Sequence, residues 1–267
     1  MSVAVMTSPA ARRELPFDGA GLNVLIDPIY HSPGFVHVVL GNAPGDPREN
    51  FLALAKCLGQ ALPQDERGTI LLDIVESSPS DAMETSFHTD GAFAPIAPDV
   101  FGLLCLRPAA DGGTVQVVNA RAVLRDLIRR CPEAMEALTQ PVPFDASRQI
   151  VADEHALTEV PIVAKSAHGD LLMRYFRPQI DRDALGVFQR RAIAHFEDAI
   201  FAAPRVEVSL AAGDCVFVNN RWLLHNRTRF KRAASSAERR RMLRVWLRQS
   251  PSTQQEDYPW PTNLQRS

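Results

Sequence analysis

The sequence predicts a mainly β fold with flanking helices, a double-stranded β-helix (jelly roll) that forms one domain over residues 1–267. Three observations predict it: short strand-like segments dominate, helical segments are few, and strands and helices do not alternate regularly. The chain is 46% hydrophobic and 22% charged, which is ordinary for a globular protein and sufficient for a substantial core. No internal repeat or low-complexity linker divides it into separate domains.

The N-terminal third predicts two strands, one helix and a loop. Residues 1–20 are rich in Ala, Ser and Pro, so we expect a loose N-terminal arm or an edge there. A strand over residues 34–40 precedes a helix whose N-cap is Asp46, and a second strand covers residues 69–75. The polar segment that follows, residues 76–87, is expected to form a lid loop over an active site.

The remaining segments are mostly strands, with helices between them. A continuous apolar run at residues 100–106 suits a core strand, and Asn119 is expected to cap a helix over residues 120–130. Apolar residues recur at three- and four-residue steps from Leu185 to Ile200, which predicts the longest helix. The other expected strands are residues 114–118, 160–164, 171–176, 206–210, 215–218, 222–225 and 242–247.

Charge, cysteine content and hydrophobicity indicate which partners and which cellular compartment to expect. The formal net charge of −2 gives no reason to expect nucleic acid or an anionic membrane as partner. The four cysteines form no CxxC pair, so neither a zinc ribbon nor a disulfide framework is indicated, and buried free thiols are expected. Because the sequence shows neither a signal-peptide core nor a run of about 18 apolar residues, we expect a cytoplasmic protein.

Two histidines and an aspartate form a candidate metal site. Side chains alternate between faces in an extended strand, so His88 and Asp90 point the same way, about 7 Å apart. A lone histidine is more often a core residue than a ligand, and a His-x-Asp pair recurs by chance. A second imidazole, from His225, would complete a two-histidine, one-carboxylate face with open positions opposite, as in non-haem Fe(II) oxygenases.

Five motifs then follow one another in order. They are His88-Thr89-Asp90, Gly112-Gly113-Thr114, residues 213–220, residues 225–230 and residues 240–244. In this order the sequence resembles the Fe(II)/2-oxoglutarate-dependent oxygenases of the taurine dioxygenase and clavaminate synthase-like superfamily, over approximately residues 50–248. The resemblance implies a clavaminate synthase-like jelly roll that binds Fe(II) through His88, Asp90 and His225 and uses 2-oxoglutarate and O2.

The distal carboxylate of 2-oxoglutarate needs a guanidinium partner, because a forked, always-charged donor pairs with it through two hydrogen bonds. By motif, Arg244 is the matching arginine. It lies between two apolar residues, where a buried charge without a partner would be unfavourable, so an anionic ligand is indicated. Arg240 is expected to assist, and the resemblance implies that the hydroxyl of Thr114 holds the same carboxylate.

The substrate is expected to be a small polar molecule, most simply a free amino acid or a derivative in specialised metabolism. Glu84 is a candidate contact for a substrate amine. Arg227 is expected to contact a substrate carboxylate or to form a salt bridge on the rim, and Asn219 to face the substrate or to make a turn. The carboxylate of Asp90 argues for hydroxylation, because related halogenases carry a small residue at that position.

Two alternatives remain open. Within the superfamily, the protein could be a sulfonate or aryloxyalkanoate oxygenase that serves nutrient scavenging. In a different class, the same three ligands would hold Zn(II) in a jelly-roll hydrolase or binding module. Arg244 and Thr114 discriminate, because a hydrolase has no use for a 2-oxoglutarate clamp. The sequence gives no indication of the oligomeric state.

Overall fold

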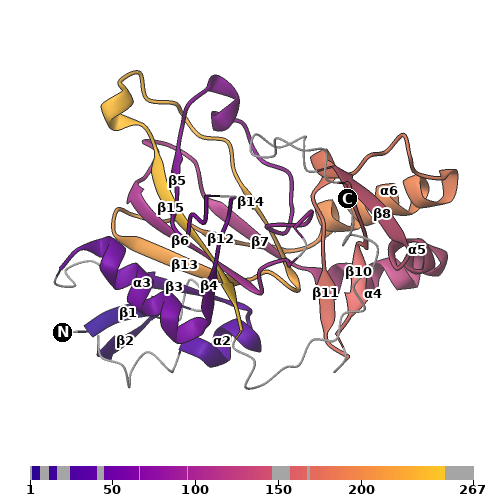
Figure 1. Ribbon diagram of the computed structural model, residues 1–267, viewed down its shortest axis with the longest axis horizontal. Coiled ribbons are helices and arrows are strands. Elements are labelled where there is room, and N and C mark those ends of the chain that lie inside the picture. The colour runs from indigo at the N-terminus through magenta and orange to yellow at the C-terminus, as the bar shows by residue number, and fades with distance from the viewer. Residues whose placement is uncertain are drawn as a thin grey trace.

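A large antiparallel sheet forms the centre of the protein (Figure 1). The computed structural model describes residues 2–6, 12–16, 25–40, 45–65, 67–94, 96–145, 157–166 and 169–249. Strand order in this major sheet is β2-β1-β3-β13-β6-β15-β4, and β5 also pairs with β15. The strands are β1 (Ser2–Met6), β2 (Arg12–Pro16), β3 (Phe35–Val39), β4 (Gln60–Leu62), β5 (Leu72–Val75), β6 (Val100–Arg107), β13 (Asp214–Asn219) and β15 (Arg241–Arg248).

A minor sheet packs against the inner face of the major sheet. Its order is β12-β7-β14, with β7 (Val115–Asn119), β12 (Arg205–Val208) and β14 (Leu223–Arg227). Val117 and Leu223 of the minor sheet share one buried cluster with Phe101 and Val216 of the major sheet. Two sheets with a common core between them are the arrangement of a jelly roll, so the predicted fold class is confirmed.

Helices cover the outer faces of both sheets. Helices α2 (Ile26–Tyr30) and α3 (Pro47–Leu58) pack on the major sheet through a second apolar cluster. On the minor-sheet side, a third cluster joins α4 (Ala120–Arg130), α5 (Pro132–Leu138) and α6 (Val187–Ala202), which lie together in Figure 1. Two hairpins accompany them, made of β8 (Pro141–Asp145), β9 (Leu157–Pro161), β10 (Val163–Lys165) and β11 (Leu171–Met173). Short 3-10 turns complete the elements: η2 (Pro79–Ala82), η4 (Arg177–Gln179) and η5 (Ser236–Glu238).

Local signals explain where the helices begin. The Asp46 side chain accepts a hydrogen bond from the Arg48 N–H at 2.9 Å, and Asn119 accepts one from Arg121 N–H at 2.9 Å. Each cap satisfies a backbone donor that has no partner within its helix. Both caps were expected from the sequence.

Some elements differ from the sequence expectation. Of the two expectations for residues 1–20, a loose arm or an edge, the structure shows the edge, because β1 and β2 extend the major sheet beyond β3. The strand expected over residues 171–176 ends at Met173, because the chain then turns so that Phe176 forms a single bridge with His88. Among the described residues, no helix combines the length and the apolar character that crossing a membrane requires.

Candidate metal centre

His88 and His225 lie opposite each other because their backbones pair. The His88 N–H donates to the His225 carbonyl at 2.9 Å, and the His225 N–H donates back at the same distance. Directly opposed residues on neighbouring antiparallel segments send their side chains to the same face. The two imidazole rings accordingly have centroids 4.2 Å apart.

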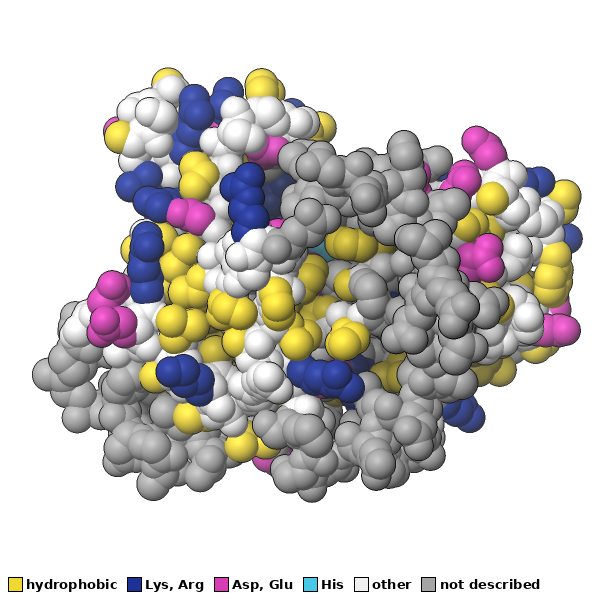
Figure 2. Space-filling view, viewed as in Figure 1, with side chains coloured by type: hydrophobic (Ala, Val, Ile, Leu, Met, Phe, Trp, Pro, Cys, Tyr) yellow, Lys and Arg dark blue, Asp and Glu magenta, His cyan; other side chains and the backbone are white. Residues whose placement is uncertain are grey.

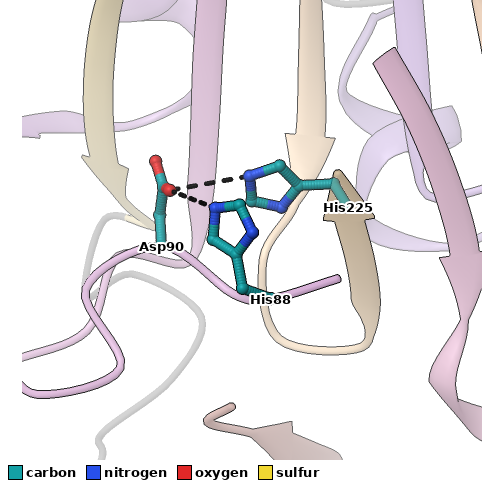
Figure 3. A group of neighbouring side chains, drawn as sticks. All are labelled: His88, Asp90 and His225. Atoms are coloured by element: carbon teal, nitrogen blue, oxygen red, sulfur yellow. Dashed lines mark ion pairs between the residues drawn. The ribbon is translucent and has the colours of Figure 1, made fainter. Parts of the chain in front are cut away.

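Asp90 completes the group predicted from the sequence. Its Oδ1 lies 3.6 Å from Nε2 of His88 and 3.5 Å from Nε2 of His225 (Figure 3). One ligand atom from each of the three residues falls within 4.8 Å of the others. Asp90 is 4% exposed and His225 is 6% exposed, so most of the site is closed to bulk water. Three donor atoms in this arrangement can share one metal ion.

Protonation also suits metal binding. The Ser86 carbonyl lies 2.8 Å from Nδ1 of His88, so Nδ1 donates to it, and Nε2, on the side of Asp90, is the atom that a metal would use. Burial lowers the pKa of His225 to about 4, with a further lowering from His88, so this imidazole is neutral near pH 7. Burial alone would raise the pKa of Asp90, but Arg244 and the two histidines hold it well below its usual range.

Two side chains that the sequence did not mark as ligand supports hold Asp90 in place. The Asn220 amide accepts a hydrogen bond from the Asp90 N–H at 2.8 Å and donates to the Asp90 carbonyl at 2.9 Å. The indole N–H of Trp246 donates to Oδ2 of Asp90 at 2.8 Å. Trp246 could have been found from the sequence, because it lies two residues after Arg244 and therefore on the same face of β15.

A cavity of about 410 Å³ opens beside the three ligands. Three arginines, Arg227, Arg240 and Arg244, line it together with residues of the lid segment, residues 76–87. In Figure 2, a band of hydrophobic side chains crosses the middle of the face, with Lys and Arg side chains above and below it. The carboxylates of Glu76, Asp81 and Asp90 line the same cavity, so it presents charged groups of both signs and can bind a small polar molecule.

In the structure Arg244 has protein partners, and Arg240 is the arginine without a carboxylate partner among the described residues. Arg244, expected to lack a protein partner, lies 3.2 Å from Oδ2 of Asp90 and donates to Oε1 of Gln64 at 2.8 Å. Arg240 is half-buried, and no carboxylate forms an ion pair with it among the described residues. Burial, and then the nearby positive charge of Arg227, lower the pKa of Arg240 to about 10. Arg240 is therefore the guanidinium that an anion would compensate.

Thr114 does not line the cavity beside the metal ligands. A second cavity, of about 310 Å³, is lined by Thr114, the Gly112-Gly113 turn and Arg240, so Arg240 borders both cavities. A Cβ atom on Gly113 would come within 3.3 Å of Nε of Arg240, and Gly113 has a φ of +75°. Glycine here allows both the turn and the close approach of the guanidinium.

The three expected substrate contacts have other partners in the structure. Asn219 makes the turn that was the alternative expectation, because its amide accepts from the Arg221 N–H and donates to the Ile29 carbonyl. Glu84 lines a neighbouring cavity, apart from the one beside the metal ligands, and accepts from Nδ2 of Asn226 at 3.0 Å. Arg227 does line the metal-site cavity, but its guanidinium donates to carbonyls of the lid segment.

The lid segment is ordered by these and other contacts. Nη2 of Arg227 donates to the carbonyls of Asp81 and Met83, both at 2.7 Å. The Asp81 carboxylate accepts from the N–H groups of Ser77 and Ser78, also at 2.7 Å, and so caps η2. Residues 85–87 run beside β14, where the Thr85 N–H donates to the Arg227 carbonyl at 3.0 Å. These contacts fix residues 85–87 beside β14, and a lid over the cavity stays a prediction for this segment.

One curated protein is similar to part of this chain. The chain is 26% identical over 168 residues to FR-33289 synthase of Streptomyces rubellomurinus (strain ATCC 31215), which covers 57% of this chain and 47% of that protein. The chain thus spans about half the length of this curated relative.

Solved structures share the fold. An asparagine oxygenase in complex with Fe(II), 2S,3S-3-hydroxyasparagine and succinate has a TM-score of 0.61 and 22% identity, covering 74% of this chain and 63% of that chain. The non-heme iron oxygenase OrfP, in complex with Fe and alpha-ketoglutaric acid, has a TM-score of 0.57 and 21% identity, covering 79% and 68%. PvcB from Pseudomonas aeruginosa has a TM-score of 0.57 and 18% identity, covering 78% and 73%.

A model of one protein family matches residues 32–246, which is most of the chain. That family is described as taurine catabolism dioxygenase TauD, TfdA family, so the resemblance of the sequence motifs is confirmed. This chain belongs to the TauD, TfdA family.

Proposed function

We propose that this chain is an Fe(II)- and 2-oxoglutarate-dependent dioxygenase that hydroxylates an unactivated C–H bond of a free amino acid or a derivative. The observation that carries the proposal is the group of His88, Asp90 and His225 on the wall of a cavity that also contains Arg240. When bound, Fe(II) and 2-oxoglutarate supply the oxidising power together with O2. The protein supplies orientation and excludes water from the site.

The donor set fits Fe(II). Two neutral imidazoles and one ionised carboxylate on the same side of a metal are the ligands of non-haem Fe(II) oxygenases. In this chain, burial keeps His225 neutral, and the Ser86 carbonyl fixes the tautomer of His88. A zinc hydrolase would use the same ligands, but it would not need Arg240 beside them, a half-buried arginine that has no carboxylate partner among the described residues.

In our proposal Arg240, rather than Arg244, holds the distal carboxylate of 2-oxoglutarate. A dicarboxylate between the metal site and Arg240 would compensate a guanidinium that has no carboxylate partner among the described residues. Thr114 lines the second cavity, where its hydroxyl lies 3.3 Å from Oγ of Ser209, so it would donate to this carboxylate only if the cosubstrate extends past Arg240 into that cavity. Arg244 then keeps its contact with Asp90.

Charged groups of both signs on the cavity wall support a polar substrate such as an amino acid. Arg227 and Arg244 line the cavity together with the carboxylates of Glu76 and Asp81, so a substrate can meet donors for a carboxylate and acceptors for an amine. Two proteins of similar fold were solved with hydroxylated amino acids: the asparagine oxygenase with hydroxyasparagine, and OrfP with (3S)-hydroxy-L-Arg. A sulfonate or aryloxyalkanoate also carries the anionic group that such a wall recognises, so it is the second substrate class to test.

Anaerobic addition of Fe(II) and 2-oxoglutarate tests the site. We expect a weak visible charge-transfer band in the wild-type protein and none in Asp90→Ala, which loses one ligand. A screen of amino acids, sulfonates and aryloxyalkanoates, read by succinate release, tests the substrate. Release that depends on an amino acid supports the proposal, and release with sulfonates or aryloxyalkanoates alone would reassign the substrate. The absence of both the charge-transfer band and succinate release would overturn the oxygenase assignment.

We also propose that the protein acts in the cytoplasm. All four cysteines, Cys57, Cys105, Cys131 and Cys215, are free thiols. Unpaired cysteines are typical of a reducing compartment. Fractionation of the native host would test this expectation.

A further inference from the structure

The two carboxylate oxygens of Asp90 have different neighbours. Oδ1 faces the two histidines, at 3.5 Å from one Nε2 and 3.6 Å from the other. Oδ2 faces β15, where it accepts a hydrogen bond from the indole N–H of Trp246 at 2.8 Å and lies 3.2 Å from Nη1 of Arg244. One oxygen is therefore available to a metal, while the other is engaged by the protein.

We propose that Trp246 is a positioning residue that keeps Asp90 a one-oxygen ligand of the metal. This inference rests on the proposed function, because it assumes a metal held by His88, Asp90 and His225. It adds a role for a tryptophan that lies in the core between the two sheets and is 5% exposed.

The number of ligand atoms matters for the reaction. Three protein donors on a six-coordinate ion leave three positions open. A chelating cosubstrate occupies two of them, so one position is left for the remaining reactant. If both oxygens of Asp90 bound the metal, that last position would be filled. A donor that holds Oδ2 away from the metal therefore preserves the position that the reaction requires.

Trp246 is better suited to this task than Arg244. Arg244 lines the cavity, its side chain is 22% exposed, and an anion in the cavity would compete for its guanidinium. The indole is neutral and buried, and it does not line the cavity. Arg244 lies over the indole ring at 4.8 Å, and a Cβ atom on Gly91 would come within 3.4 Å of the ring, so the backbone there leaves little room for the indole to turn. The indole N–H therefore keeps its direction whatever anion enters the cavity.

The test is anaerobic titration of the full chain with Co(II), without 2-oxoglutarate, followed by the visible ligand-field bands. We expect Trp246→Phe to raise the Kd for Co(II) by about 10- to 100-fold, as loss of a partner that orients a ligand typically does. We also expect the shape of the bands to change, because Asp90 binds through both oxygens. The matched control is Trp222→Phe, since Trp222 is equally buried in the same core and its indole makes no contact with Asp90.

A second replacement removes the N–H group without changing the size of the ring. Benzothienylalanine, introduced at position 246 alone, replaces the indole N–H by sulfur and guards against misfolding of Trp246→Phe. An unchanged Kd for Co(II) with unchanged visible bands in this variant would overturn the inference. A raised Kd with unchanged bands would also overturn it, and so would an equal rise of the Kd in Trp222→Phe. Failure of the wild-type protein to bind Co(II) would instead overturn the proposed function.

Discussion

Backbone hydrogen bonds hold the two histidines, whereas an arginine side chain holds much of the lid above them. His88 and His225 of β14 exchange two N–H···O bonds, each of 2.9 Å, in an isolated bridge. The turn of the lid segment is fastened by Nη2 of Arg227, which donates to two backbone carbonyls at 2.7 Å. Both regions border the same cavity.

The comparison shows what each region depends on. A pair of residues in such a bridge keeps its position when other side chains change, because the bonds are made by the backbone. A loop held by one guanidinium loses its hold when that residue is replaced. The metal ligands should therefore respond to changes in their own chemistry, and the lid to changes at Arg227.

The largest effect concerns the buried imidazole of His225 in the metal-free protein. The unfolded chain binds a proton on this residue below about pH 6.5, while the folded protein binds it only below its pKa of about 4. The folded state is therefore destabilised as pH falls through this window, by about 3 kcal/mol in total. Urea unfolding at pH 7 and pH 4.5 would measure the difference in the free energy of unfolding between the two pH values.

Two variants in the same measurement test whether His225 causes this pH dependence. His225→Gln should flatten the loss of stability between the two pH values, because the titrating group is gone. His31→Gln removes an exposed histidine and should leave the loss unchanged. An identical pH dependence in His225→Gln and wild type would show that the imidazole is not held neutral by burial.

Next in size is the effect at Arg240. Arg240→Met should raise the KM for 2-oxoglutarate by about 10- to 100-fold, the loss expected for hydrogen bonds to a charged group. Arg241→Met is the control, because Arg241 lies beside it and pairs with Asp73 at the edge of the sheet. If Arg244→Met raised this KM and Arg240→Met did not, the sequence assignment of the clamp would be right. In our proposal Arg244→Met weakens metal binding instead.

The order of the motifs predicts that His88, Asp90 and His225 come together, and the structure groups them. The strand expected around His88 is absent, because His88 forms only isolated bridges, one of them with His225, and Asp90 lies in a turn. The partner of Arg244 could not be predicted, because Gln64 and Asp90 reach it from different parts of the chain. Asn219 makes the turn that the sequence offered as one of its two roles, but its bond to the Ile29 carbonyl, 190 residues away, could not be predicted.

A smaller effect is expected in the lid. Arg227→Met removes hydrogen bonds to the Asp81 and Met83 carbonyls, which should lower the local stability of residues 77–83 by about 1–2 kcal/mol. Hydrogen exchange of these amides should accelerate by about tenfold, while exchange in β14 stays slow. Arg229→Met is the matched control on an exposed side chain. Equal exchange in both variants would mean that Arg227 does not hold the lid.

The smallest effect is expected at Glu84, where the sequence suggested a contact with a substrate amine. Its carboxylate faces the neighbouring cavity and accepts a hydrogen bond from Asn226, so a substrate beside the metal does not meet it. Glu84→Gln keeps an oxygen that accepts from Asn226, and we expect the KM of the identified substrate to change by less than about twofold, within ordinary surface effects. A tenfold rise would show that the lid segment moves until Glu84 reaches the substrate. The lid would then take part in substrate recognition as well as in closing the cavity.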